Sequence, residues 1–125
     1  MVQTGAEAVE SAMKLARRWG YMKKGIAADK AIILACTENF HGRTISVISM
    51  STDETCRSQY GPFMERVGPV CPVGKTKEGE PYAIRFGVIE DLEKALEKHG
   101  RQVAAFIVEP IQGEAGYVSR PALRA

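Results

Sequence analysis

The chain has 125 residues, which is about the size of one ordinary domain. Hydrophobic residues make up 45% of it and charged residues 26%, a composition that is typical of a soluble globular protein and excludes a disordered one. The formal net charge of +2 predicts little attraction for phosphate backbones, so we expect no nucleic-acid partner. No apolar run approaches the ~20 residues of a membrane span, so we expect no membrane partner.

The cysteines bear on metal binding and on the compartment. Cys36, Cys56 and Cys71 are odd in number and irregularly spaced, and none belongs to a Cys-x-x-Cys or Cys/His pattern. We therefore expect reduced thiols in an intracellular compartment and no metal site. Because no signal or transit peptide is visible, the expected location is cytoplasmic; a mitochondrial location stays open if an N-terminal segment precedes this one.

The first predicted element is a helix over residues 5–24. Apolar side chains recur there at three- and four-residue steps, at Ala8, Ala12, Leu15, Ala16 and Trp19, and Val9 and Met13 widen this stripe. Thr4 is the expected N-cap, and Glu7, three residues later, would complete a capping box. Gly25 is the expected stop.

A strand and an irregular region follow. The continuous apolar run over 31–36 predicts a strand that is covered on both faces. The connection over 37–44 is rich in turn residues, and 45–50 favours a short helix. Glycines and prolines recur over 51–86 and predict turns and loops there. Within this region residues 70–73 favour one short strand.

The last part repeats the strand and helix patterns. Residues 88–99 predict a helix in which Ile89, Leu92 and Leu96 share a face. The apolar run over 103–108 predicts a second strand covered on both faces. Strand, helix, strand order indicates an α/β fold with a mostly parallel sheet and flanking helices.

Several polar groups fall where ligands bind in such folds. Gly5 and Ala6 open the first helix, whose free N–H groups would suit a phosphate; an ordinary helix cap is the alternative. Arg43 follows the first strand, at the carboxyl edge of the sheet, where a guanidinium can grip a carboxylate or can simply be a surface charge.

Other residues at the same edge leave their roles open. His41 could be a base or a ring partner, or plain structure, and Phe40 is a core residue by default. Glu109 and Glu114 follow the second strand, and a paired-carboxylate hydrolase has no other support. The stretch Gly74-Lys75-Thr76 is not a phosphate loop, because Pro69 stands where the earlier glycine should be.

Three segments together carry a family resemblance. They are Thr4-Gly5-Ala6-Glu7-Ala8, Asn39-Phe40-His41-Gly42-Arg43-Thr44 and Glu109-Pro110-Ile111-Gln112-Gly113-Glu114. In order and spacing they resemble the class III aminotransferases that depend on pyridoxal 5'-phosphate (PLP). The finer resemblance, in Leu15–Tyr21, Tyr60–Met64 and Ile89–Leu96, is to ornithine aminotransferases. The resemblance implies that residues 1–118 form part of the large, PLP-binding domain of a fold-type I transferase. Residues 119–125 would be a divergent tail.

The resemblance implies a role for each motif. Gly5 and Ala6 would bind the cofactor phosphate through backbone N–H groups. Phe40 would stack on the pyridine ring with His41 beside it. Glu109 would support the polar network around the cofactor.

The substrate roles also come from the resemblance. Arg43 would bind the carboxylate of ornithine or of 2-oxoglutarate. Glu114 would act in substrate choice by pairing with an arginine far along the chain. The implied reaction moves the δ-amino group of ornithine to 2-oxoglutarate, in a protein that is a homodimer or a larger oligomer in this family.

The chain departs from the family in what it lacks. None of its lysines matches the Schiff-base lysine, so we expect no catalytic lysine and no activity from these 125 residues alone; they are Lys14, Lys23, Lys24, Lys30, Lys75, Lys77, Lys94 and Lys98. The alternatives are another class III enzyme, acting on acetylornithine or 4-aminobutyrate, and a non-catalytic α/β fragment that pairs with a full-length relative.

Overall fold

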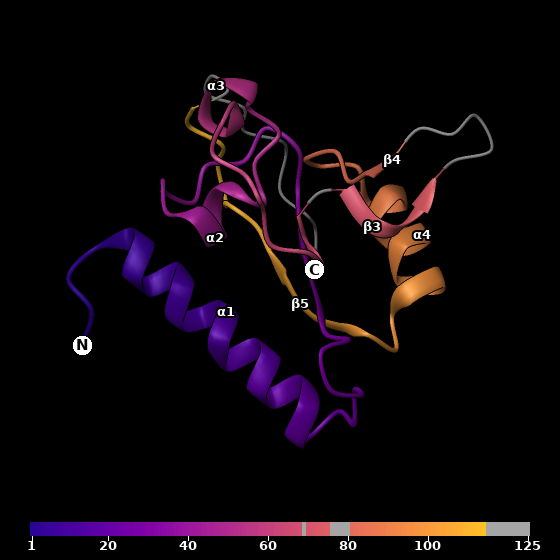
Figure 1. The fold of residues 1–125 in the computed structure, drawn as a ribbon. Coiled ribbons are helices and arrows are strands. Elements are labelled where there is room, and N and C mark those ends of the chain that lie inside the picture. The colour runs from indigo at the N-terminus through magenta and orange to yellow at the C-terminus, as the bar shows by residue number, and fades with distance from the viewer. Residues whose placement is uncertain (69, 76–80, 115–125) are drawn as a thin grey trace.

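The computed structural model describes residues 1–68, 70–75 and 81–114 (Figure 1). In chain order its elements are α1 (Gly5–Met22), β1 (Ile32–Ala35), α2 (Ile45–Ile48), α3 (Glu54–Arg57), β2 (Val67–Gly68), β3 (Val70–Lys75), β4 (Pro81–Ala83), α4 (Ile89–His99) and β5 (Val103–Ile107). The predicted domain boundary at residue 118 lies outside the described residues. Among the helices of the described part, none is long and apolar enough to cross a membrane.

Three strands form a parallel sheet in the order β2-β1-β5. The central strand β1 pairs with both neighbours, for example Ile33 with Val67 of β2 and Leu34 with Phe106 of β5. This confirms the α/β class and the parallel sheet. The sequence does not predict β2, because a two-residue strand has no periodicity to detect. β3 and β4 form a separate antiparallel ribbon.

A helix covers each face of the parallel sheet, with α1 on one side and α4 on the other (Figure 1). Alternate residues of β1 pack into two separate clusters, as the pleat of a strand requires. The cluster toward α4 contains Ile32, Leu34, Cys36, Ile84, Ala95 and Val103. The cluster toward α1 contains Met13, Ile33, Ala35, Met50 and Val67. Every residue of β1 is buried, which confirms the prediction of a strand covered on both faces.

The buried face of α1 is narrower than the predicted one. Met13 is buried, and Val9 and Ala16 pack beside it against the sheet. Leu15 and Trp19 are 69% and 49% exposed, so their assignment to the core-facing stripe is wrong. The helix carries apolar residues on more than one side, and periodicity alone does not choose among them.

The second half of the sheet is less covered than the sequence predicts. Ala95 is the buried residue of α4 and Leu92 packs beside it, but Ile89 and Leu96 are 46% and 41% exposed. In β5 only Val103 is fully buried. In the described part of the chain β5 is an edge strand with one neighbour, β1, which leaves it less covered than the central strand.

Candidate active site

The loop after β1 carries the Phe40–Arg43 motif, and Asn39 anchors it. The Asn39 side chain is 7% exposed, and its Nδ2 donates to the carbonyl oxygens of Cys36 at 2.6 Å and Met50 at 2.8 Å. The carbonyl of Cys36 directly follows β1, and that of Met50 follows α2. The buried amide therefore fixes both ends of the loop at the carboxyl edge of the sheet, where ligands bind in parallel α/β folds.

The same loop lies directly against the first turn of α1. Gly42 has φ +124°, and a Cβ added to it would lie 3.2 Å from the Cβ of Ala6. Farther along, the hydroxyl of Thr44 donates to the Glu10 carboxylate at 2.6 Å, and the hydroxyl of Ser46 donates to the same oxygen. The helix tip and the loop, which are distant in sequence, are thus neighbours in space.

The tip of α1 keeps two backbone donors free. The Glu7 carboxylate accepts the N–H groups of Gln3 and Thr4 at 2.9 Å each, and these bonds lower the pKa of Glu7. Thr4 in turn accepts the N–H of Glu7, which confirms the predicted capping box. Within the described residues nothing accepts the N–H groups of Gly5 and Ala6, and no atom lies within 4 Å of an added Gly5 Cβ. This helix start can receive an anion.

A cavity of about 380 Å³ opens beside the loop. The residues around it are Glu38, Asn39, Phe40, His41, Gly42, Arg43, Val47, Ser51, Thr52, Asp53, Glu54, Cys56 and Glu114. Its volume falls in the range of small-molecule sites, about 300–1,000 Å³. Acidic side chains outnumber basic ones among the described residues that line this cavity. Arg43 is the one cation of that lining.

Arg43 is held by a thiol and faces an aromatic ring. Its Nη1 donates to the Cys56 sulfur at 2.9 Å, and the same sulfur donates to Asp53 Oδ2 at 2.9 Å. The guanidinium carbon lies 5.6 Å from the centre of the Phe40 ring. Phe40 is 37% exposed, which corrects its default assignment as a core residue. Arg43 therefore presents a fixed positive charge beside an accessible ring.

Two side chains tie the end of β5 to the loop after β1. Glu109 accepts the backbone N–H of Phe40 at 3.1 Å. Gln112, which is 1% exposed, donates through Nε2 to the carbonyl of Thr37 at 2.8 Å. The polar patch that follows β5 thus reaches the Phe40–Arg43 loop across the sheet edge, as the parallel topology predicts.

His41 is neutral at physiological pH. Burial lowers the pKa of its imidazole, and the Glu109 carboxylate offsets part of this effect. Its Nε2 is buried and has no hydrogen-bond partner among the described residues. A neutral ring with an unused nitrogen, at the wall of a cavity, can exchange one hydrogen bond with a bound molecule.

The structure brings the predicted site residues together. Phe40, His41, Arg43 and Glu114 line the cavity, and Glu109 is bonded to the backbone of Phe40. Gly5 and Ala6 do not line the cavity, but Ala6 touches the loop at Gly42. The predicted divergent tail lies outside the described residues.

Four further residues at this edge are not singled out by the sequence. They are Asn39, Asp53, Cys56 and Gln112. Asn39 and Gln112 belong to the sequence motifs, so their position near the site is predicted. The hydrogen bonds that their buried side chains make to backbone carbonyls are not predicted. Asp53 carries a weaker signal, since it is the N-cap of α3 and accepts the N–H of Thr55. Nothing in the sequence marks Cys56 as a partner of Arg43.

Comparison with known proteins decides the family. Residues 1–123 match the family model described as aminotransferase class III. The chain belongs to the class III aminotransferases. Class III relatives similar to it include the ornithine aminotransferases of Schizosaccharomyces pombe, 55% identical over 115 residues, and Saccharomyces cerevisiae, 54% identical over 123 residues. These matches cover 92% and 97% of the chain but 25% and 27% of the relatives, so it spans about a quarter of their length.

Solved structures agree with the class III assignment. An ornithine aminotransferase of Toxoplasma gondii, described as partly occupied by PLP, superposes with a TM-score of 0.79 at 40% identity. The match covers 96% of this chain and 25% of that one. An acetylornithine aminotransferase of Elizabethkingia anophelis gives a TM-score of 0.61 at 42% identity, with 95% and 25% covered. The parallel sheet with flanking helices is accordingly that of a fold-type I transferase.

The described residues of this class III chain fit PLP. The free N–H groups of Gly5 and Ala6 suit a phosphate, and the accessible face of Phe40 suits an aromatic ring. The cavity beside Phe40 has room for a small molecule. Within the described part of the chain, no lysine lines this cavity.

Proposed function

We propose that this chain forms part of the cofactor and substrate site of an ornithine aminotransferase, which moves the δ-amino group of ornithine to 2-oxoglutarate. One observation carries the proposal: the tip of α1 touches the Phe40–Arg43 loop through Ala6 and Gly42. A phosphate at the helix tip and a ring at the loop can therefore belong to one molecule. The identities of 54% and 55% to ornithine aminotransferases support the choice of substrate.

The cofactor would be held by groups that the described fold leaves available. Gly5 and Ala6 would donate backbone N–H groups to its phosphate, with help from the helix dipole. Phe40 would offer a flat apolar face to its ring. Glu109 would keep the backbone of Phe40 in place, since it already accepts that N–H. His41 would add one hydrogen bond from a neutral ring.

The substrates would be held by charge. Arg43 would bind the carboxylate of either substrate in a bidentate pair, because the N–H groups not used by Cys56 have no other partner among the described residues. Glu114 would favour the cationic substrate, and it would act through an arginine that the resemblance places elsewhere in the longer protein. When bound, PLP supplies the electrophilic aldehyde and the electron-withdrawing ring that amino-group transfer requires.

The 125-residue chain by itself is expected to be inactive. No lysine of the described part lines the cavity, and no lysine of the sequence matches the family's Schiff-base lysine. Incubating the purified chain with PLP, ornithine and 2-oxoglutarate should give no glutamate. Sustained turnover would contradict this expectation.

Cofactor binding can be tested without the lysine chemistry. Pyridoxine 5'-phosphate carries an alcohol in place of the aldehyde, so it cannot form a Schiff base with surface lysines. We expect it to bind the chain in a calorimetric titration, and we expect Phe40→Leu to weaken binding. The matched control is Tyr60→Leu, because Tyr60 is 58% exposed and does not line the cavity. Equal affinity for both variants would remove Phe40 from the cofactor site.

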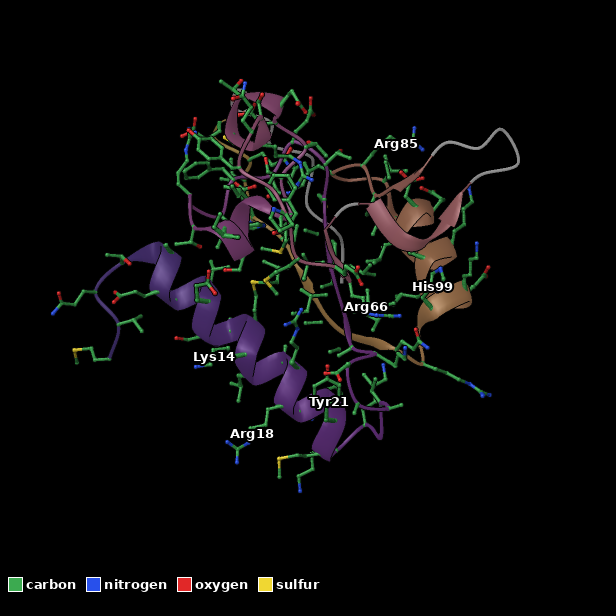
Figure 2. The ribbon with its side chains drawn as sticks, in the orientation of Figure 1. Lys14, Arg18, Tyr21, Arg66, Arg85 and His99 are labelled. Carbon is green, nitrogen blue, oxygen red and sulfur yellow. The ribbon has the colours of Figure 1, made fainter. Side chains whose placement is uncertain are left out.

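Activity can be tested in a chimera. The part of this chain that aligns with the Saccharomyces cerevisiae ornithine aminotransferase, 54% identical over 123 residues, would replace its counterpart in that enzyme. We expect the chimera to transfer the amino group of ornithine, and Arg43→Gln to lower kcat/KM by about 30- to 150-fold, the effect of losing about 2–3 kcal/mol of charged hydrogen bonding. Arg18→Gln is the matched control, because Arg18 projects from α1 away from the sheet (Figure 2).

The same assay distinguishes the proposed function from the two alternatives, another class III enzyme and a non-catalytic fragment. A chimera that prefers acetylornithine or 4-aminobutyrate to ornithine would move the assignment to another class III enzyme. A chimera that folds, binds PLP and acts on none of these amines would favour a non-catalytic fragment.

Assembly and location remain expectations for the longer protein. We propose a homodimer or a larger oligomer, testable by light scattering of the chimera. Two plant relatives are named mitochondrial. We propose a cytoplasmic location here unless a leader segment precedes this sequence, testable by fractionation of source cells.

A further inference from the structure

The side chain of Arg57 holds the backbone where α2 ends. Its Nη1 donates to the carbonyl oxygens of Ile48 at 2.8 Å, Ser49 at 3.1 Å and Ser51 at 3.2 Å. The last carbonyls of a helix lack partners within the helix, and a guanidinium has enough N–H groups to serve several of them. Arg57 is the last residue of α3, so these bonds fix α3 against the end of α2 (Figure 1).

An aromatic ring keeps this guanidinium in place. The guanidinium carbon of Arg57 lies 4.0 Å from the centre of the Phe63 ring, which is close enough for a cation–π contact. The residue after Phe63 is bonded to the same backbone, because the N–H of Met64 donates to Ser49 Oγ at 2.9 Å. Arg57 therefore joins three stretches of chain, which are the end of α2, α3 and the segment that contains Phe63.

The chain between Ser51 and Arg57, which we call the 51–57 segment, forms part of the cavity wall. The bond from Arg57 to the Ser51 carbonyl joins the two ends of this segment. Arg57 itself does not line the cavity, so its effect on a bound molecule must pass through the residues that do. Those residues of the segment are Ser51, Thr52, Asp53, Glu54 and Cys56.

The 51–57 segment in turn holds Arg43. The Arg43 Nη1 donates at 2.9 Å to the sulfur of Cys56, which is the neighbour of Arg57 in α3. Within the described residues this sulfur is the one hydrogen-bond partner of the Arg43 side chain. Cys56 is only 8% exposed, so its thiol moves with the backbone of α3. A shift of α3 would therefore shift the guanidinium of Arg43.

We propose that Arg57 is a positioning residue for the amino-group transfer, because it fixes α3 and thereby sets where the Arg43 guanidinium lies in the cavity. This rests on the proposed function, since it takes Arg43 as the group that binds the carboxylates of both substrates. Arg57 contributes to binding without touching either substrate. Its loss should weaken ornithine and 2-oxoglutarate by a similar factor, because both present a carboxylate to Arg43.

Lys24 offers a matched control, because it makes the same kind of contact elsewhere. Its Nζ donates to the carbonyl oxygens of Gly100 and Val103 at 2.7 Å each. Val103 begins β5, so this contact lies at the amino edge of the parallel sheet, opposite the edge that carries the cavity. Removal of either cation leaves backbone carbonyls without a donor and should lower stability. Of the two cations, Arg57 is the one next to the thiol that holds Arg43.

The first test is steady-state kinetics of the chimera with ornithine and 2-oxoglutarate. Arg57→Gln should raise both KM values about five- to thirtyfold and change kcat less than about twofold, because a guanidinium that is no longer held binds substrate and transition state equally less well. The effect should stay below that of Arg43→Gln, since a misplaced group retains part of its binding. Lys24→Gln should leave both KM values within about twofold of the parent chimera, because distant sites act independently.

Two further variants distinguish positioning from a general structural role. The double variant Arg43→Gln/Arg57→Gln should have the kcat/KM of Arg43→Gln alone, within about twofold, because no guanidinium is left to be positioned. A purely structural role for Arg57 would instead multiply the two losses. Arg57→Lys keeps the charge and the N–H donors but loses the planar contact with Phe63, so its KM values should fall between those of the parent and of Arg57→Gln.

The second test does not depend on activity. Iodoacetamide alkylates a buried thiol only when the surrounding structure opens, and peptide mass spectrometry gives the rate at each cysteine of the full 125-residue chain. Cys36, 3% exposed in the cluster toward α4, is the internal reference for opening of the sheet. Arg57→Gln should raise the ratio of the Cys56 rate to the Cys36 rate at least about fivefold, the effect of losing hydrogen bonds from a charged group. Lys24→Gln should leave the ratio unchanged.

Each outcome bears on the inference or on the proposed function. Unchanged KM values in Arg57→Gln overturn the inference, and the proposed function stands if Arg43→Gln still lowers kcat/KM. An unchanged alkylation ratio also overturns the inference, because α3 would then not depend on Arg57. Losses that multiply in the double variant make the role structural and overturn it too. If the chimera does not act on ornithine at all, the proposed function and the inference are both overturned.

Discussion

Replacing Gly42 by alanine tests the contact on which the site depends. Gly42 has φ +124°, a conformation that L side chains rarely adopt, and strain of this kind costs about 1–3 kcal/mol. Space is also short, because the new methyl would lie 3.2 Å from the Ala6 Cβ, 3.5 Å from the Ala6 Cα and 3.6 Å from Val47 Cγ1. We expect Gly42→Ala to lower the free energy of unfolding by about 2–3 kcal/mol, toward the upper part of that range.

Two other glycines separate strain from crowding. Gly25 has φ +76° and nothing within 4 Å of an added Cβ, so Gly25→Ala should lose about 1–2 kcal/mol through the backbone alone. Gly113 lies outside the left-handed φ region and has nothing within 4 Å of an added Cβ, so Gly113→Ala should be neutral or stabilising by less than about 1 kcal/mol. The expected order of stability is Gly113→Ala, then Gly25→Ala, then Gly42→Ala.

Urea unfolding followed by circular dichroism gives the three free energies. For a domain of this length, 1 kcal/mol corresponds to a fall of about 4 °C in Tm, so Gly42→Ala should melt about 8–12 °C below the wild type. A Gly42→Ala protein as stable as Gly113→Ala would refute the reasoning. It would mean that the loop after β1 does not pass against the tip of α1, and the shared cofactor site would lose its support.

Three further outcomes follow from the packing and the titratable groups. Ile33→Ala, at a position that is 0% exposed, should cost about 2–5 kcal/mol in the urea experiment, whereas Leu15→Ala, at a position 69% exposed, should cost less than about 1 kcal/mol. Thr4→Ala removes the capping acceptor for α1 and should cost about 0.5–2 kcal/mol, with a matching loss of helical ellipticity. Burial lowers the pKa of both His41 and His99, so the unfolded chain binds these protons first as the pH falls. The contribution of these two neutral histidines to the free energy of unfolding should therefore be fully present above about pH 7 and should be lost as the pH falls through about 6.5, the ordinary histidine pKa. Replacing both histidines by glutamine should make the urea concentration at the unfolding midpoint depend less on pH between about 7.5 and 5.5.

The sequence by itself determined the longer elements and the motifs. The apolar run over 31–36 predicts β1 because a strand buried on both faces must be apolar throughout, and the structure buries every residue of β1. The capping box at Thr4 and Glu7 is local chemistry within one turn, so it too is readable in advance. The three motifs, taken together, identified the family that the comparisons confirm.

Tertiary structure decided which faces and which side chains meet. The predicted stripe of α1 includes Leu15, Trp19 and Met13, but only Met13 is buried against the sheet, and only the position of β1 could settle which part of the stripe is covered. The contact of Ala6 with Gly42 and the row from Arg43 through Cys56 to Asp53 join segments that no periodicity connects. A sequence pattern reports what each segment prefers locally. The order of parallel strands brings their carboxyl ends to one edge, and that order decides which of these segments share a site.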